Sequence, residues 1–301
     1  DYGRSRGLGD VYKRQLGSGK TTLLNHILSS TEHKMKFAVI ENEFGDIGID
    51  ENILVESSEE SVIEVMNGCI CCTVRGDLTD LLDDMYDRIK DFDGVLIETT
   101  GLADPAPVAQ TFFVDEKVVN RYKLDGIITV VDAKHIIQHV DEEKPEGVEN
   151  EAVEQLAFAD RIMLNKIDLV SDEELEDVEG KIKSINRFAP IYHTENSIID
   201  PKNLINIGSF DLEKILEMDP EFLDTDAEHE HDERVTSTSS KFEGSLNVNK
   251  LQHWIGDLLR NYGEDLFRYK GVLSVKGMDE KFVFQGVHML FSGDFTTEIA
   301  S

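Results

Sequence analysis

Apolar positions fall into short continuous runs that alternate with stretches of helical spacing from residue 16 onward. Helices are predicted over 21–29 and over 78–90, where apolar residues recur every three or four positions. Four runs rich in branched residues predict buried strands, at 37–40, 94–97, 126–131 and 161–164. This alternation predicts an α/β fold with a mainly parallel sheet and with ligands at the carboxyl ends of its strands.

The pattern changes after about residue 206, which divides the chain into two domains. An acidic stretch with His229 and His231, two candidates for weak metal capture, leads into a Ser/Thr-rich run and predicts an exposed linker over 207–241. The positions at 242–301 predict a small α+β domain that ends incomplete. Its expected elements are a helix over 248–262 and two strands, over 267–275 and 281–291. Four aromatic side chains are expected in its core: Trp254, Phe282, Phe284 and Phe291.

The first fifteen residues differ from the rest of the chain. They are rich in Gly and Arg, show no apolar period and carry a net positive charge, whereas the whole chain has a formal net charge of −31. We therefore predict that residues 1–15 are an artefactual segment outside the fold and that the first domain occupies 16–206.

The composition limits the classes of partner. A hydrophobic fraction of 40% is sufficient for a core. The net charge of −31 repels a phosphate backbone, so no nucleic-acid partner is expected. No apolar run reaches the roughly 18 residues that span a bilayer, so no membrane partner is expected. Three clustered cysteines form no disulfide framework, which favours a reducing, cytoplasmic compartment.

A phosphate-loop ending stands at the start of the first predicted helix. The residues are Gly17, Ser18, Gly19, Lys20, Thr21 and Thr22. Backbone amides at a helix start cradle phosphate oxygens, the lysine reaches the β- and γ-phosphates, and Thr21 is placed to bind Mg²⁺. Arg14 stands where the complete motif has its first glycine. The alternative is a Gly-rich turn into an ordinary helix.

Two distant motifs support a nucleotide site. Glu98 ends a predicted strand, where its carboxylate would hold Mg²⁺ through water, and the Gly101 amide would approach the γ-phosphate. The tetrapeptide from Asn165 through Lys166 to Asp168 follows another strand. A carboxylate at Asp168 accepts hydrogen bonds from guanine N1–H and N2–H₂, a donor pair that adenine lacks, so GTP is the predicted nucleotide.

All three cysteines lie within four positions, at Cys69, Cys71 and Cys72. Thiolates are soft ligands that suit Zn²⁺, Co²⁺ or Cu⁺. Three of them this close would strain one tetrahedral ion. Two thiolates with a carboxylate, a histidine or water fit better, and Glu41 and Glu43 are candidate oxygen donors. The alternatives are a turn of three small buried residues and a redox pair.

These residues, in this order, resemble the CobW family of metal-handling GTPases, and especially its eukaryotic zinc-regulated metalloprotein-activator branch. The resemblance runs from residue 16 to about 293. Its motifs comprise residues 17–28, 41–45, 67–72, 98–105, 131–133, 165–168, 268–273 and 285–288. It implies a P-loop GTPase domain followed by a CobW-type C-terminal domain. It further implies a metallochaperone that binds zinc at the cysteines, hydrolyses GTP and delivers the metal to an apo-metalloenzyme, with methionine aminopeptidase as the client.

The mechanism that we predict is a coupled switch. GTP with Mg²⁺ orders the loop 41–46, which completes zinc coordination with the cysteines, and hydrolysis releases it. Lys20 and Glu98 would stabilise the reacting phosphates, and Asp46 or Glu43 would orient the attacking water. The rivals are a regulatory GTPase with structural cysteines, a cobalt or other-metal chaperone, a metal buffer, and an ATP-dependent kinase.

Overall fold

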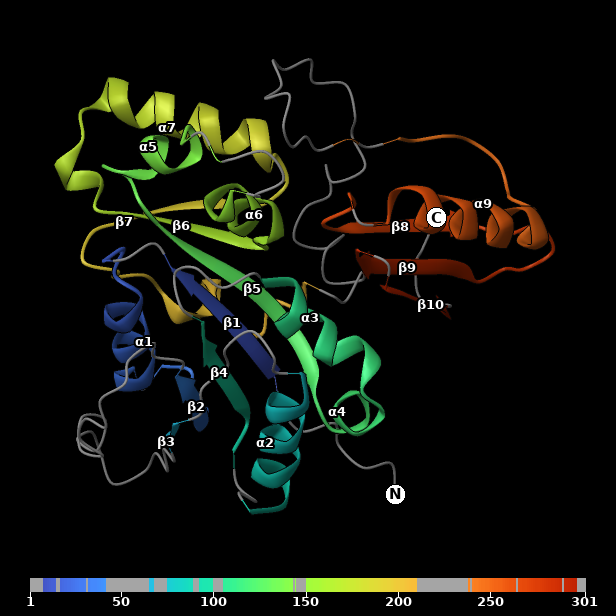
Figure 1. Ribbon diagram of the computed structural model, residues 1–301, viewed down its shortest axis with the longest axis horizontal. Coiled ribbons are helices and arrows are strands. Elements are labelled where there is room, and N and C mark those ends of the chain that lie inside the picture. The colour runs from blue at the N-terminus through green and yellow to red at the C-terminus, as the bar shows by residue number, and fades with distance from the viewer. Residues whose placement is uncertain are drawn as a thin grey trace.

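The described residues form a seven-stranded parallel sheet and a three-stranded antiparallel sheet (Figure 1). The computed structural model describes residues 8–14, 17–30, 32–41, 65–67, 75–88, 92–99, 105–142, 144, 150–209, 238, 240–263, 265–288 and 290–296. The strand order in the large sheet is β3-β2-β4-β1-β5-β6-β7. Its strands are β1 (Leu8–Arg14), β2 (Phe37–Glu41), β3 (Val65–Asn67), β4 (Gly94–Glu98), β5 (Lys123–Asp132), β6 (Arg161–Asn165) and β7 (Ile191–Thr194).

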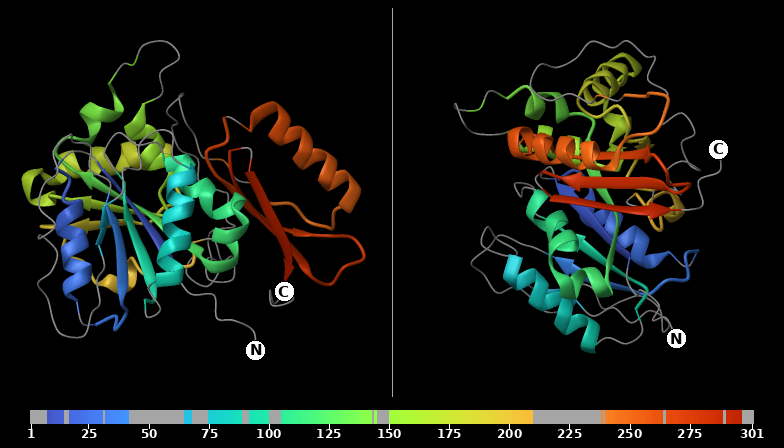
Figure 2. Two further views of the ribbon diagram at one scale, coloured as in Figure 1. Left: turned by 60° about the horizontal axis from the view of Figure 1, so that its bottom comes forward. Right: turned by 90° about the vertical axis from the view of Figure 1, so that its right-hand side faces the viewer.

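Helices cover both faces of the large sheet (Figures 1 and 2). One face carries α2 (Arg75–Arg88), α3 (Pro105–Val114), α4 (Glu116–Arg121), α5 (Ile136–Val140), α6 (Glu151–Phe158) and α7 (Asp172–Ile185). The other face carries α1 (Lys20–Ser29) and the segment around the short helix η2 (Pro201–Asn203). Along β5, Ile127 and Val131 face the first layer, whereas Ile128 and Val130 face the second.

Burial on both faces explains why the predicted strands are continuous apolar runs, without the polar alternation of a half-exposed strand. The predicted α/β class and all four strands are confirmed. Three helices that the sequence analysis did not name, α4, α6 and α7, begin after side chains that cap them: Asp115, Asn150 and Ser171. Ser171 and Glu174, for example, form a capping box at the start of α7.

The exclusion of the first fifteen residues from the fold was wrong for β1. Leu8–Arg14 lies in the middle of the sheet and pairs in parallel with β4 and β5. Arg14, which stands where a complete phosphate loop has its first glycine, is the last residue of this strand and lies opposite Val130. A strand between two others needs only an extended backbone, because its neighbours supply partners for every N–H and C=O group. An apolar period is therefore not required for β1 to form.

The smaller sheet belongs to a C-terminal unit whose described residues form one helix and three strands. Its elements are α9 (Val248–Tyr262), β8 (Tyr269–Ser274), β9 (Lys281–Val287) and β10 (Leu290–Thr296), in the strand order β10-β9-β8. The helix over 248–262 is confirmed. The single strand expected over 281–291 is a hairpin, because the chain turns at His288, where φ is 50°.

Trp254 is not a core residue, contrary to the prediction. Its side chain is 54% exposed, whereas Leu251 and Ile255 of the same helix are buried against the small sheet. Successive helical residues are about 100° apart around the axis, so the neighbour of Ile255 points away from the surface that Ile255 covers. Phe282 and Phe291 do pack on this core and stack on each other, with ring centroids 6.2 Å apart.

The C-terminal unit docks on the large sheet through a buried ion pair. Arg268 Nη1 lies 2.6 Å from Asp160 Oδ1 and also donates to the carbonyl oxygen of Phe158, at 3.0 Å. The second oxygen of Asp160 accepts a bond from the Ile127 backbone N–H, at 2.8 Å. The His288 ring packs on Phe158, with centroids 5.6 Å apart. Figure 2 shows the small sheet between α9 and the large domain.

Residues 207–209, which the sequence analysis assigned to the linker, are bound to the large domain. The Asp125 carboxylate accepts hydrogen bonds from the backbone N–H groups of Ile207, at 2.9 Å, and Gly208, at 2.7 Å. The Ser209 N–H donates to the Asp125 carbonyl oxygen, at 2.7 Å. None of the described helices is long and apolar enough to cross a membrane.

Lys270 at this junction should make stability rise with pH above neutrality. Burial, reinforced by the nearby Arg268 charge, lowers the pKa of Lys270 to about 8, from 10.5 for an ordinary lysine. Between these two values the unfolded chain holds more protons than the folded chain, so the free energy of unfolding rises with pH. We expect a gain on the order of 1–2 kcal/mol between pH 8 and 10.5, allowing for partial exposure of the side chain.

The measurement is urea unfolding of the parent protein and of Lys270→Met at several pH values. The difference in unfolding free energy between them should change over this interval. Lys276→Met, at an exposed lysine of the same unit, is the control and should follow the parent. Parallel pH profiles for the parent and Lys270→Met would contradict the prediction.

Candidate nucleotide and metal site

The carboxyl ends of the parallel strands bring the predicted motifs to one edge of the large sheet. Asn67, which precedes the cysteines, lies opposite Glu41, and Glu41 lies opposite Glu98. Farther along the same edge, Asp132 lies opposite Asn165, and Asn165 opposite Thr194. The backbone that leads into the cysteine motif is therefore two strands away from Glu98.

Two glycines shape the turn between β1 and α1. Gly17 has φ 78° and Gly19 has φ 106°, a region that residues with a Cβ rarely adopt. Gly19 is also tightly enclosed. A Cβ there would lie 2.4 Å from Asn165 Nδ2 and 2.5 Å from Ser197 Oγ. Only glycine fits this position, which holds the first amides of α1 against the loops that follow β6 and β7.

The structure brings the predicted lysine and carboxylate together. Lys20 is the first residue of α1 and is almost fully buried, and its Nζ lies 2.8 Å from Glu98 Oε1. A short buried pair of this kind fixes the ammonium group at the carboxyl ends of the strands. An anion that arrived at the helix start would compete with Glu98 for this ammonium group.

The residues at the start of α1 fit a bound phosphate. The hydroxyl of Ser18 is buried and has no hydrogen-bond partner among the described residues. The first turn of α1 adds backbone N–H groups that point out of the helix start and the positive end of the helix dipole. Thr21 and Thr22 are exposed on the first turn. An anionic ligand with several acceptor oxygens would satisfy these donors together.

Asn165 connects the phosphate loop to two other loops. It is 2% exposed, and its Nδ2 donates to the Ser18 carbonyl oxygen, at 2.8 Å, and to Ser197 Oγ, at 3.0 Å. Its Oδ1 accepts bonds from Thr194 Oγ1, at 3.1 Å, and from the Ser197 N–H, at 2.9 Å. Both ends of the amide are therefore used to hold neighbouring loops in register.

Ser197 was not identified from the sequence. Its Oγ donates to the Gly19 carbonyl oxygen, at 2.7 Å, and both Asn196 and Ser197 have positive φ, 51° and 58°. A left-handed conformation at two successive non-glycine residues is uncommon and marks a constrained loop. The sequence feature that could have identified Ser197 is the polar tripeptide 195–197. It directly follows the short strand β7, at the same sheet edge as the other motifs.

The other two residues of the predicted base site lie at the end of β6. Lys166 has a left-handed backbone, with φ 64°, and its Nζ lies 2.7 Å from Asp132 Oδ2. Asp168 lies in the short helix η1 (Ile167–Leu169) and is exposed. Its carboxylate is therefore accessible to a ligand from solvent.

Much of the predicted metal site lies outside the described residues. This applies to Cys69, Cys71, Cys72, Glu43 and Asp46, and also to Gly101, His229 and His231. Glu41 is placed by its backbone alone, next to Asn67. Within the described part of the chain, no three His, Cys, Asp or Glu residues are grouped to hold a metal ion.

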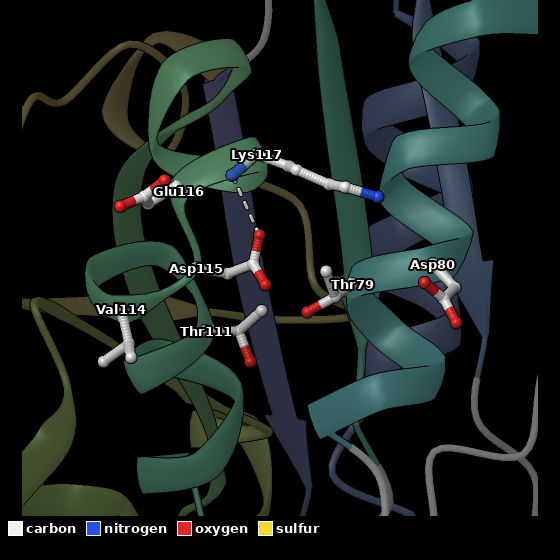
Figure 3. Close-up of a pocket in the computed structure, with 7 residues that line it drawn as sticks. All are labelled: Thr79, Asp80, Thr111, Val114, Asp115, Glu116 and Lys117. Atoms are coloured by element: carbon white, nitrogen blue, oxygen red, sulfur yellow. Dashed lines mark hydrogen bonds between the residues drawn. The ribbon is translucent and has the colours of Figure 1, made fainter.

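A cavity of about 500 Å³ lies between α2, α3 and α4 (Figure 3). It is lined by Thr79, Asp80, Thr111, Val114, Asp115, Glu116 and Lys117. Asp115 caps α4 by accepting from the Lys117 backbone N–H, at 2.9 Å, and Lys117 Nζ pairs with Asp83, at 2.9 Å. The Lys117–Asp83 ion pair joins α4 to α2, and none of the lining residues belongs to the predicted site.

The parallel sheet and the loops around Lys20 and Asn165 define a P-loop GTPase fold. This chain belongs to the CobW/HypB/UreG family: residues 13–193 match its nucleotide-binding domain. Residues 235–300 match the cobalamin synthesis protein cobW C-terminal domain.

Two curated relatives and one solved structure cover most of the described fold. The chain is 36% identical to the zinc chaperone YjiA of Escherichia coli (strain K12), over 93% of this chain and 86% of that protein. It is 35% identical to the zinc-regulated GTPase metalloprotein activator 1 of Dictyostelium discoideum, over 67% of this chain. The match spans about half of that relative, 48% of its length. A crystal structure of Zn(II)-bound YjiA GTPase from E. coli aligns with a TM-score of 0.69 at 29% identity, covering 97% of this chain and 90% of that one.

Proposed function

We propose that this protein is a GTP-hydrolysing zinc metallochaperone in which nucleotide turnover controls metal binding at the cysteine motif. One observation carries the proposal. The strand that leads to the cysteines ends two strands from Glu98, whose carboxylate holds the phosphate-loop lysine. A change at the phosphates therefore has a short route to the metal-binding loop. The names of the relatives support zinc as the metal.

In this proposal the nucleotide lies along the carboxyl edge of the large sheet. Its phosphates bind the amides of residues 17–22, and Lys20 leaves Glu98 to contact them. Thr21 would hold Mg²⁺, which supplies charge neutralisation at the reacting phosphates, and Glu98 would bind it through water. Gly101 would donate its N–H to the γ-phosphate.

The base would lie between Lys166 and Asp168. The exposed Asp168 carboxylate selects guanine through the N1–H and N2–H₂ donors, which adenine does not present. The loop of residues 165–168 is called the base loop. Asn165 supports this selection because its side chain holds the phosphate loop and the base loop together. A nucleotide competition assay with GDP and ADP separates this reading from an ATP-dependent kinase.

Zinc would be held by two thiolates and an oxygen ligand. Cys69 and Cys71 are the proposed thiolate ligands, and Cys72 is an alternative thiolate ligand. Either Glu41 or Glu43 supplies the carboxylate. Such a set leaves an exchangeable position, which suits a protein that transfers its metal. Cobalt is the alternative metal, since soft thiolates accept both ions.

The loop 41–46 would couple the two halves of the site. It follows β2, whose end lies between β3 and β4 at the sheet edge. GTP binding would order the loop and complete the zinc site, with Asp46 or Glu43 orienting the attacking water. Hydrolysis would release the loop and weaken zinc binding. The client would be an apo-metalloenzyme of the cytoplasm, with methionine aminopeptidase as the first candidate.

Replacement of one thiolate tests this coupling. Cys71→Ser should abolish the stimulation of GTP hydrolysis by zinc, because loss of one thiolate removes most of the metal affinity. Its affinity for GDP should equal that of the parent, since the nucleotide contacts are intact. GTP turnover at controlled free zinc, together with titration of a fluorescent GDP analogue, measures both quantities.

Cys72→Ser is the matched comparison. If Cys69 and Cys71 form the ligand pair, this variant should keep the zinc stimulation. Stimulation that is unchanged in Cys71→Ser would favour the rival in which the cysteines are structural and the protein is a regulatory GTPase. Tight zinc binding with no dependence on GTP would instead favour a metal buffer.

A further inference from the structure

Asp132 lies at the end of β5, and its carboxylate binds groups around the loop of residues 165–168. Its Oδ2 accepts hydrogen bonds from Lys166 Nζ, at 2.7 Å, and from His135 Nδ1, at 3.1 Å. Its Oδ1 accepts a bond from the Lys134 backbone N–H, at 2.9 Å. Asp132 is 4% exposed, whereas the Lys166 side chain is 30% exposed. The carboxylate is therefore a fixed, buried support for a more accessible cation.

The charge of this carboxylate is maintained by its partners. Burial alone would raise the pKa of Asp132, but hydrogen bonds from Lys166 and His135 outweigh burial and lower it. Asp132 is therefore ionised at neutral pH. A charge-assisted hydrogen bond from an ammonium group to a buried carboxylate is stronger than a neutral one and holds the long lysine side chain in one orientation.

The backbone of Lys166 is also in a conformation that needs stabilisation by its surroundings. Its φ of 64° is uncommon for a residue with a Cβ and costs about 1 kcal/mol or more. The next residues form η1, which carries Asp168. A tether at the end of the Lys166 side chain therefore stabilises the backbone turn that places Asp168.

We propose that Asp132 is a positioning residue for the nucleotide base: it holds Lys166 so that the side chain lies alongside the purine ring while Asp168 reads the ring edge. The inference rests on the guanine site of the proposed function. Asp132 touches neither base nor phosphate in this assignment, and its effect on the base passes through Lys166. The aliphatic stem of Lys166 then offers an apolar surface to the base.

Asp132→Asn keeps the size of the side chain and removes its charge. It should weaken GDP binding about tenfold, the effect of losing one charge-assisted hydrogen bond. The affinity for IDP, which lacks the 2-amino group, should fall by the same factor, because Lys166 contacts the ring as a whole. Asp168→Asn should instead weaken GDP more than IDP. Titration of each nucleotide against a fluorescent GDP analogue provides these ratios.

Glu174→Gln is the matched control. Glu174 is an exposed carboxylate whose Oε1 lies 3.0 Å from Nζ of Lys134, the residue two positions after Asp132. This variant should bind GDP as the parent does. Should Asp132→Asn fail to fold, Lys166→Gln tests the same tether from its other end, with the same expected loss for both nucleotides.

A double mutant separates positioning from general support of the fold. In a Lys166→Gln background, Asp132→Asn should cause no further loss of GDP affinity, since its effect passes through the lysine. A tenfold loss in both backgrounds, or a parent-like affinity in Asp132→Asn, would overturn the inference. A parent protein that binds no guanine nucleotide would overturn the proposed guanine site as well, so the two failures are distinguishable.

Discussion

Gly19→Ala should abolish nucleotide binding while the protein stays folded. The new Cβ would lie 2.4 Å from Asn165 Nδ2 and 2.5 Å from Ser197 Oγ, and the backbone at φ 106° is unfavourable for alanine. Asn165 is buried and makes four hydrogen bonds, so it cannot move away without breaking them. We expect a loss of GDP affinity of at least about 100-fold, from backbone strain and broken buried hydrogen bonds together.

Gly180→Ala is the control for this substitution. Gly180 lies inside α7, where a Cβ would meet nothing within 4 Å. This variant should bind GDP as the parent does and should be more stable by about 0.5–1 kcal/mol, because alanine favours helix over glycine. Circular dichroism checks the fold, and titration of a fluorescent GDP analogue measures the affinity. Binding of GDP to Gly19→Ala at the parent level would contradict the described geometry of the phosphate loop.

Asp160→Ala should destabilise the attachment of the C-terminal unit. Asp160 accepts a bond from Arg268, at 2.6 Å, and another from the Ile127 N–H, at 2.8 Å, and its side chain is 3% exposed. Removal of the carboxylate leaves the Arg268 charge buried beside Lys270. Breaking one side of a buried ion pair costs about 3–5 kcal/mol. The urea midpoint of unfolding should fall accordingly, followed by circular dichroism.

Asp257→Ala provides the comparison at the surface. Asp257 pairs with Arg260 on α9, but the two side chains are 61% and 70% exposed. Solvent screens such a pair, so the expected cost is within about 0.5 kcal/mol. Equal losses in Asp160→Ala and Asp257→Ala would show that the Arg268 contact does not hold the two parts together.

The sequence was most informative about structure where a single physical requirement determines which residue types occur at each position. Strands β4 and β6 must be apolar on both faces, since helices cover both sides of the sheet, and their continuous runs were recognised for that reason. The phosphate loop and the loop of residues 165–168 could be predicted as binding sites because phosphate binding and guanine selection each require particular residues at fixed spacing, and both assignments stay predictions. Their convergence at Lys20, Glu98 and Asn165 follows from the parallel topology.

Other features depend on partners that are distant in the chain. The strand β1 has no apolar period, but β4 and β5 complete its hydrogen bonds. The roles of Asp132 and Ser197 arise from contacts with Lys166 and Gly19, 34 and 178 positions away. The exposure of Trp254 depends on which side of α9 faces the small sheet, and an aromatic side chain alone does not show it. The cysteine ligands stay a prediction, since they lie outside the described residues.

The central claim, that GTP hydrolysis and metal binding are coupled, is tested most directly by GTP turnover as a function of free zinc. The assay uses the parent protein and an Arg14→Gly variant, which introduces the first glycine of a complete phosphate loop. We expect zinc to increase turnover, with the larger increase in Arg14→Gly. Turnover that is the same at every zinc concentration in both proteins would contradict it.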